Sequence, residues 1–416
     1  MADILVYILY TALFCGLYFQ IFLLLTFFEG KDPQVAENDK GHIKGDDAFP
    51  SVTVVVPCFN EAKTLRGTIM SLLALDYPKN KLSVMIVDDG SKDETLSIAK
   101  SLAKQFPQQV KTIAKENGGK HTAVNLAIAE CTTELIGCLD ADSFVEPSTL
   151  RKMIPYFNDQ KTMAVTPAMR VHKPENLLQL MQKAEYNLGI FTKRIFGMLD
   201  AIHVTPGPFS IFRRSVFDKI GVFKKAHNTE DMEIAFRIQS HGYRIANCHT
   251  AHVYTVTPDT VKKLHRQRTR WIYGFINNTI DYKHILFNKK YGNMGMLTIP
   301  CSVISIVFTF YMIGYFLFRV GANTADNIER WMTVGINFHM PTFDLFFFNT
   351  EILTFLGIVI FALTAFIVLL GKKLAEDSAV PSRDIVYFFI FYPFVAPFWL
   401  GKAVYNTVFA KNTPWR

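Results

Sequence analysis

Cysteine is scarce in this chain, and the spacing of the few cysteines excludes several kinds of site. Six cysteines occur in 416 residues, with no C-x-x-C pair and no spacing typical of metal ligands, so buried reduced thiols are expected. No internal repeat or low-complexity tract is present, which excludes a repeat protein. The net charge is +8, but no recognised nucleic-acid motif and no interleaving of basic with aromatic residues accompanies it, so nucleic acid is not an expected partner.

Charged residues are absent from three long stretches, residues 4–28, 294–318 and 352–371. Each is long enough to cross a bilayer core of about 30 Å as a helix. A fourth stretch, residues 385–408, contains Pro393 and Pro397 and is interpreted either as a kinked span or as a re-entrant hairpin. The first stretch has no basic start and no cleavage site of small residues, so we expect a retained anchor at residues 1–28 rather than a signal peptide.

Basic residues concentrate between the first two of these stretches. Of 44 Lys and Arg residues, 36 lie between residues 29 and 293, against 28 acidic residues. The positive-inside rule therefore predicts a multi-pass protein of the plasma membrane with this segment in the cytoplasm. Anionic membrane lipids are the expected partner of the basic charge. The flanking charges do not determine on which side the C-terminus lies.

The pattern between the apolar stretches predicts an α/β domain. Residues 29–50 are polar and without periodicity, as in a linker. From residue 51 on, β-prone runs at 52–56, 82–87, 110–114 and 134–139 alternate with helical patterns at 61–74, 93–105 and 120–131. This alternation predicts a mainly parallel sheet with helices on both faces, in a cytoplasmic domain over residues 51–255. Ligands of such sheets bind at the carboxyl ends of the strands.

Two further segments have apolar residues at helical spacing. The helix predicted at residues 174–199 either covers the sheet or lies in the membrane interface. The second helix, at 261–285, belongs to a segment at 256–293 that directly precedes an apolar stretch, which favours the interface. Residues 294–416 then form a C-terminal membrane region with spans at about 294–318, 352–371 and 385–408.

Acidic and glycine-rich motifs follow the predicted strands. Asp140 and Asp142 emerge one residue apart, where they either form an ordinary turn or supply the oxygen ligands that suit Mg²⁺ or Mn²⁺ on a diphosphate. Asp88 ends an earlier strand, where a carboxylate can bind a ribose or a base edge. Lys120 begins a helix after two glycines, a position that favours an anion such as phosphate.

Two later motifs also allow a structural and a catalytic interpretation. Thr229-Glu230-Asp231 either stabilises the start of a helix or presents Asp231 as a general base for an acceptor hydroxyl. In Gln267-x-x-Arg270-Trp271, the arginine and the tryptophan either anchor a helix at the membrane or bind phosphate oxygens and a sugar ring. The order of these motifs along the chain favours the catalytic interpretation.

Together with Pro57-x-x-Asn60-Glu61, these motifs resemble those of membrane-embedded processive family 2 glycosyltransferases, most of all poly-N-acetylglucosamine and hyaluronan synthases. The resemblance implies a GT-A fold and an inverting, metal-dependent transfer from a UDP-sugar to the hydroxyl of a growing β-linked polysaccharide. It also implies residue roles: a nucleoside site of Pro57, Asn60, Glu61 and Asp88, phosphate contact by Lys120, metal and nucleotide binding by Asp140 and Asp142, a base at Asp231, and diphosphate and acceptor binding by Gln267, Arg270 and Trp271.

Two alternatives remain open at this point. Such synthases usually have more spans than four, so a single sugar transferred to a membrane lipid is one alternative. A non-catalytic polysaccharide-export or nucleotide-sensing membrane protein is the other. Accessory membrane or export subunits are further expected partners of a synthase with so few spans.

Overall fold

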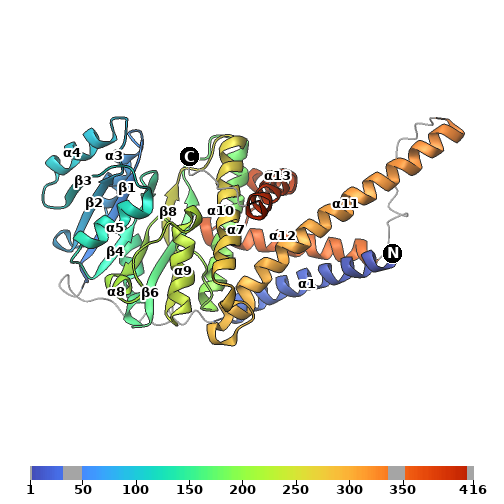
Figure 1. Ribbon diagram of the computed structural model, residues 1–416, viewed down its shortest axis with the longest axis horizontal. Coiled ribbons are helices and arrows are strands. Elements are labelled where there is room, and N and C mark those ends of the chain that lie inside the picture. The colour runs from blue at the N-terminus through green and yellow to red at the C-terminus, as the bar shows by residue number, and fades with distance from the viewer. Residues whose placement is uncertain (1, 31–48, 336–351, 410–416) are drawn as a thin grey trace. The chain divides into compact units, whose positions relative to one another are not determined.

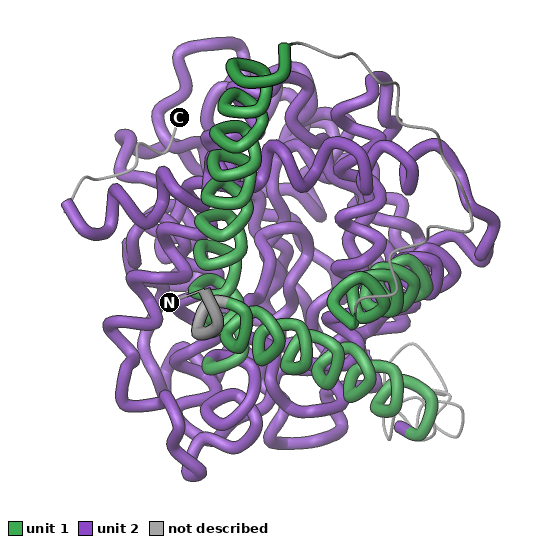
Figure 2. Tube along the Cα trace, turned by 90° about the vertical axis from the view of Figure 1, so that its right-hand side faces the viewer, with its two compact units in different colours: residues 1–29, 300–367 green, residues 30–299, 368–416 purple. Residues whose placement is uncertain are grey.

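The computed structural model describes residues 2–30, 49–335 and 352–409, and for residues 2–5 the backbone alone. The chain divides into two compact units, residues 1–29 with 300–367 and residues 30–299 with 368–416 (Figure 2). The predicted linker at residues 29–50 lies almost entirely outside the described residues. The same holds for the second half of the segment between the second and third predicted spans.

The second unit is built on an eight-stranded mixed sheet with the strand order β3-β2-β1-β4-β7-β6-β8-β5 (Figure 1). The first four strands in this order are parallel, as predicted, and β6 is parallel to β8. Strand β7 runs antiparallel to both of its neighbours, and β5 runs antiparallel to β8. The strands are β1 (Val52–Cys58), β2 (Leu82–Asp88), β3 (Val110–Ala114), β4 (Leu135–Cys138), β5 (Ser143–Val145), β6 (Thr162–Val171), β7 (Ser210–Arg213) and β8 (Arg244–Thr255).

Strand β1 lies inside the sheet because its sequence is apolar on both faces. All seven of its residues are buried. Val54 and Val56 belong to the hydrophobic cluster that contains residues of α3 and α4, whereas Val55 belongs to the cluster that contains residues of α5 and α9. Successive side chains of a strand point to opposite faces, and β-branched residues suit a strand that is covered on both.

The helices that cover the sheet match the predicted pattern, with shifted starts. They are α3 (Leu65–Leu73), α4 (Thr95–Gln105), α5 (Lys120–Glu130), α6 (Thr149–Met153), α8 (Arg214–Ile220) and α9 (Glu230–Ser240). Short 3-10 turns lie between them at Lys79–Lys81 (η2), Ile154–Asn158 (η3) and Ala226–Asn228 (η4). The first helix begins four residues later than predicted, and the backbone N–H of Glu61, which precedes it, donates to Thr95 Oγ1 at 2.8 Å.

Helices α7 (Leu177–Met198) and α10 (Val261–Asp281) join the sheet to α13 (Arg383–Val408). Helix α7 packs on β6 and β8 and also on α13, so it covers the sheet and contacts an apolar helix at once. Helix α10 packs on α13 and on η4, and is followed by the turns η5 (Lys283–Ile285) and η6 (Lys289–Tyr291). Asn176 caps α7 by accepting the backbone N–H of Gln179 at 2.9 Å.

Four helices among the described residues are long and apolar enough to cross a membrane: Val6–Glu29 within α1 (Ala2–Glu29), Met294–Val334, Ile352–Glu376 (α12) and Arg383–Val408 (α13). The second comprises a π-helical turn, η7 (Met294–Thr298), and α11 (Ile299–Val334). It extends beyond residue 318, since a change from apolar to polar residues does not by itself end a helix. Helix α13 runs through Pro393 and Pro397 as one element, in agreement with a span and not with a hairpin.

Helix α10 approaches the turn before α9 closely at Gly274. The buried Thr229 hydroxyl donates to the Ala226 carbonyl at 3.0 Å and accepts from Asn278 Nδ2 at 2.9 Å, so it cannot move aside easily. A Cβ atom at position 274 would overlap the Thr229 side chain. The absence of a side chain at Gly274 therefore lets the helix and the turn pack together.

We predict that Gly274→Ala lowers the stability of the protein by about 1–3 kcal/mol, because the added methyl group forces the helix and the turn apart. Gly189→Ala is the matched control, since this glycine also lies in a helix but has no atom within 4 Å of an added Cβ. The control should be neutral or stabilising by up to about 1 kcal/mol. Thermal unfolding of the purified proteins in one detergent measures both. Equal melting temperatures for the two variants would contradict the close packing.

Candidate active site

The carboxyl end of β2 holds a buried carboxylate with an open hydrogen-bonding position. Asp88 is 2% exposed, and its Oδ2 accepts the Ser91 backbone N–H at 3.1 Å. Its Oδ1 is buried and has no hydrogen-bond partner in the described part of the chain. Such an oxygen is costly unless a ligand or water donates to it. Pro57 lies beside it in register, opposite Val87 in the β1–β2 ladder.

The loops that follow β1 and β2 are hydrogen-bonded to each other. Asn60 has left-handed backbone geometry, with φ 57°, and its N–H donates to Ser91 Oγ at 3.0 Å. The Asn60 Oδ1 accepts the Lys92 N–H at 2.9 Å. Together with the bond from the Glu61 N–H to Thr95, these contacts bring Asn60 and Glu61 to the strand end at which Asp88 lies.

Asp89, which the sequence interpretation did not single out, shapes the glycine loop before α5. Its carboxylate accepts the N–H groups of Gly118 and Gly119 at 3.0 and 2.8 Å and pairs with Lys115 Nζ at 2.7 Å. Gly119 has φ 92°, which other residues rarely adopt. The available signal was a second aspartate directly after Asp88. Its bonds place Lys120 at the first position of α5.

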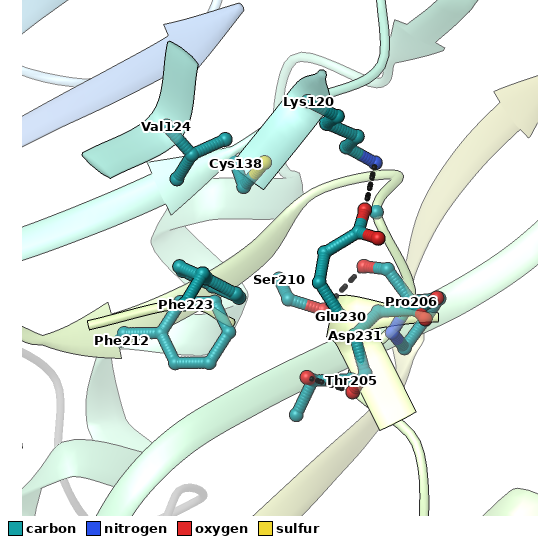
Figure 3. Close-up of a pocket in the computed structure, with 11 residues that line it drawn as sticks. Lys120, Val124, Cys138, Thr205, Pro206, Ser210, Phe212, Phe223, Glu230 and Asp231 are labelled. Carbon is teal, nitrogen blue, oxygen red and sulfur yellow. Dashed lines mark hydrogen bonds and ion pairs between the residues drawn. The ribbon is translucent and has the colours of Figure 1, made fainter. Parts of the chain in front are cut away.

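Lys120 lies between two carboxylates that come from different elements. Its Nζ is 2.5 Å from Asp140 Oδ1, after β4. The same Nζ is 3.6 Å from Glu230 Oε1, at the start of α9 (Figure 3). Burial lowers the pKa of Lys120, but Asp140 and Glu230 outweigh that effect and raise it well above its ordinary value. The ammonium group is therefore charged. The sequence did not lead us to predict Glu230 as a second carboxylate beside Lys120.

The loop before β7 passes close to the Lys120–Asp140 ion pair at Gly207. A Cβ atom on Gly207 would lie 2.6 and 2.7 Å from the two carboxylate oxygens of Asp140, so only glycine allows the approach. Phe209 follows with φ 60° and a fully buried ring, a strained backbone geometry that occurs often at functional sites. The Ser210 hydroxyl donates to the Pro206 carbonyl at 2.6 Å and closes the loop.

Asp142 lies in a region of surplus negative charge. Burial raises its pKa to about 7, with further contributions from Asp140 and Glu61. The Ser143 hydroxyl donates to it at 3.2 Å. No group of three or more Asp, Glu, His or Cys side chains among the described residues could hold a metal ion. Two carboxylates with excess charge nevertheless fit Mg²⁺ or Mn²⁺, which often take their other ligands from water and substrate phosphates.

Asp231 is held against the loop before β7. Its backbone carbonyl accepts the Thr205 N–H at 3.0 Å and the Thr205 hydroxyl at 2.8 Å (Figure 3). Burial raises the pKa of Asp231 to about 6, and the neighbouring Glu230 raises it further, whereas Lys120 and Arg270 act in the opposite direction. A small pocket brings these groups together, lined by Lys120, Val124, Cys138, Thr205, Pro206, Gly207, Ser210, Phe212, Phe223, Glu230 and Asp231.

The turn that leads into Asp231 is strained and contacts α10. Ala226, His227 and Asn228 have φ values of 40°, 56° and 62°, three left-handed residues in a row. Arg270 Nη1 donates to the Asn228 carbonyl at 2.9 Å, and His227 Nε2 lies 2.9 Å from Asp281 Oδ2 at the end of α10. Helix α10 therefore stabilises the turn that orients Asp231.

The residues of the Q-x-x-R-W motif lie in two different environments. Arg270 contacts the turn before α9 and influences Asp231, as described above. Gln267 and Trp271 instead contact Arg268: Gln267 Oε1 accepts its Nη1 at 2.9 Å, and the Trp271 ring centre lies 4.2 Å from its Cζ. The structure thus brings Lys120 and Asp231 to one pocket, and Asp140 is joined to it through its ion pair with Lys120. No hydrogen bond links Gln267 or Trp271 to that pocket among the described contacts.

The chain is similar along most of its length to known enzymes. It is 26% identical over 416 residues, 97% of this chain and 93% of the relative, to a poly-β-1,6-N-acetyl-D-glucosamine synthase of Staphylococcus epidermidis. A synthase of the same name from Staphylococcus aureus is 28% identical over 270 residues, 64% of each chain. Among solved structures, the mannosyltransferase PcManGT of Pyrobaculum calidifontis, in complex with GDP-Man and Mn²⁺, matches with a TM-score of 0.63 at 18% identity, over 99% of this chain and 98% of that chain.

The whole-chain structural match confirms the predicted GT-A-like fold with apolar helices. The family model described as glycosyltransferase like family 2 matches residues 50–274, more than half of the chain. Those residues contain every side chain of the site described above. The chain is therefore a member of glycosyltransferase family 2, an enzyme family whose members transfer sugars.

Proposed function

We propose that the enzyme transfers a sugar from a UDP-sugar to the hydroxyl of a growing β-linked polysaccharide, with inversion at the anomeric carbon. The observation that carries the proposal is the convergence of Asp231 and Lys120 on one pocket at the carboxyl ends of the strands, with Asp140 paired to Lys120. The similarity to poly-β-1,6-N-acetyl-D-glucosamine synthases over 97% of the chain supports a polymer as product and N-acetylglucosamine as the sugar.

Asp231 is the proposed general base. A base works best when its pKa lies near, but below, the working pH, and burial raises the pKa of Asp231 to about 6. At neutral pH its carboxylate is then mostly ionised and able to accept a proton from the attacking hydroxyl. Direct attack on the anomeric carbon forms the new bond as the bond to UDP breaks, which inverts the configuration and needs no covalent intermediate.

The donor is proposed to bind along the strand ends. The open Oδ1 of Asp88 can accept a hydrogen bond from the nucleoside, beside Pro57, Asn60 and Glu61. Lys120 would exchange part of its pairing with Asp140 for contact with the diphosphate. On the α10 side, Arg270 would stabilise the negative charge on departing UDP, while Gln267 and Trp271 would hold the diphosphate and the acceptor sugar.

Asp140 and Asp142 are the proposed holders of Mg²⁺ or Mn²⁺. Burial is the main cause of the raised pKa of Asp142, and the neighbouring carboxylates of Asp140 and Glu61, whose charge a cation would neutralise, raise it as well. When bound, the ion would lower the energy of the charge that develops on the diphosphate. The Mn²⁺ in the structure of the mannosyltransferase with the same fold supports this assignment.

The membrane helices are proposed to hold the catalytic domain at the cytoplasmic face of the plasma membrane. Within the described ranges, four helices are apolar enough to span, and the excess of basic residues in the catalytic domain favours the side with anionic lipid. Because the chain supplies few spans, accessory membrane or export subunits are further proposed partners in polymer export.

The base assignment predicts that Asp231→Asn lowers the rate of UDP release from UDP-N-acetylglucosamine by about 10²–10⁴-fold, because the amide cannot accept the proton. Binding of UDP, measured by calorimetry, should change little. Asp218→Asn is the control, as that carboxylate is 65% exposed on α8. Wild-type turnover in the Asp231→Asn protein would exclude this residue as the base.

Metal removal should abolish activity reversibly. We expect EDTA to stop UDP release and added Mn²⁺ or Mg²⁺ to restore it, because the ion that Asp140 and Asp142 are proposed to hold would neutralise the charge on the diphosphate. Asp142→Asn should raise the Mn²⁺ concentration that gives half-maximal rate. Full activity after exhaustive chelation, verified by elemental analysis, would contradict metal dependence.

Product length distinguishes polymer synthesis from transfer of one sugar to a lipid. Purified enzyme in lipid vesicles, supplied with radiolabelled UDP-N-acetylglucosamine, should form a high-molecular-weight product that a β-N-acetylglucosaminidase degrades. Heat-treated enzyme is the control. A label found only in an organic-solvent extract, one sugar per lipid, would show a single-transfer enzyme instead.

A further inference from the structure

Arg268, at a variable position of the Q-x-x-R-W motif, is the most deeply embedded cation of α10. Only 3% of the residue is exposed. Its Nη2 lies 2.7 Å from Glu185 Oε2 on α7, and Glu185 Oε1 accepts the hydroxyl of Tyr392 on α13 at 3.5 Å. One ion pair thus connects the helix that covers the sheet, the motif helix and an apolar helix of the membrane region.

The same guanidinium group contacts two of the motif residues. Its Nη1 donates to Gln267 Oε1 at 2.9 Å, which orients the amide. Its Cζ lies 4.2 Å from the centre of the Trp271 ring and 5.9 Å from that of Tyr186, both within the range of a cation–π contact. The positions of Gln267 and Trp271 therefore depend on where Arg268 is held.

Arg268 has little freedom to move. A buried charge is costly without its partner, so the guanidinium must stay beside Glu185. The planar fork of arginine can bind a carboxylate and an amide while its face stacks on a ring, and the point charge of lysine cannot do all three. Helix α13 is fixed on α10 a second time, by a hydrogen bond of 3.1 Å from Asn277 Nδ2 to Thr407 Oγ1.

We infer that Arg268 is a positioning residue: Glu185 and Tyr392 hold its guanidinium, and the guanidinium in turn sets the orientation of Gln267 and Trp271 toward the diphosphate and the acceptor. This inference rests on the proposed function for the roles of those two residues. It makes the placement of α13 a determinant of the reaction, although α13 contributes no side chain to the pocket around Asp231.

Fluorescence of Trp271 tests the positioning without any turnover. The chain has four tryptophans, so replacing Trp331, Trp399 and Trp415 with Phe leaves Trp271 as the only emitter of its kind. Glu185→Gln and Arg268→Lys, each made in that background, should raise the acrylamide quenching constant of Trp271, because the ring loses its stacked neighbour. Arg266→Lys is the control, an exposed arginine of the same helix that should leave quenching unchanged.

Kinetics with UDP-N-acetylglucosamine test the consequence. Displacement of Gln267 and Trp271 by about 1 Å should lower the rate of UDP release about a hundredfold in Arg268→Lys, and less in Tyr392→Phe, which keeps the ion pair. In a Trp271→Ala background, Arg268→Lys should lower the rate by a much smaller factor, because two residues that act through one contact are not additive. Arg266→Lys should retain wild-type kinetics.

The outcomes separate the inference from the proposed function. Unchanged quenching in both Glu185→Gln and Arg268→Lys overturns the inference, and so does increased quenching with undiminished UDP release. A full hundredfold effect of Arg268→Lys in the Trp271→Ala background also overturns it, since the arginine would then act by another route. If the wild-type protein releases no UDP from any UDP-sugar, the proposed function fails, while the quenching result still tests the contact itself.

Discussion

The packing of α10 on the turn before α9 is the interaction on which the rest of the site depends. Three successive left-handed residues in that turn cost of order 1–3 kcal/mol each unless their surroundings hold them. Gly274 lets the helix approach, Asn278 binds Thr229, and Arg270 binds the Asn228 carbonyl. The strained turn places the Asp231 backbone against Thr205. The helix with the Q-x-x-R-W motif and the turn that leads into Asp231 thus form one unit.

The second constraint is the balance between the charge of Lys120 and the charges of the carboxylates around it. Lys120 is paired with Asp140 and approached by Glu230, while Asp142 is left among carboxylates with a raised pKa. The site therefore has an ammonium group that can turn to an anion and, beside the pocket, acidic groups that a divalent cation would neutralise. A nucleoside diphosphate with its metal ion supplies both charges together, which agrees with membership of glycosyltransferase family 2.

Much of the fold could be predicted because its signals are local. The valines of β1 lie in an apolar run that suits only a strand covered on both faces, and the alternation of strands and helices follows from periodicity. The motif residues at the strand ends could also be predicted as one site, since parallel strands bring their carboxyl ends to one edge of the sheet. Asp89 and Arg268 were not recognised, because their importance comes from atoms 29 and 83 positions away in the sequence, the Gly118 N–H and the Glu185 carboxylate.

The sequence by itself determined the α/β domain, the apolar helices and the residue types of the site, since composition and periodicity act over a few neighbouring positions. Tertiary structure decided how those residues are combined. It paired Lys120 with Asp140 and directed Arg270 to the turn before α9, whereas Gln267 and Trp271 face Arg268 and its partner on α7. The physical reason is that a buried charge is stable only beside a partner, and only the folded chain determines which partner lies within reach.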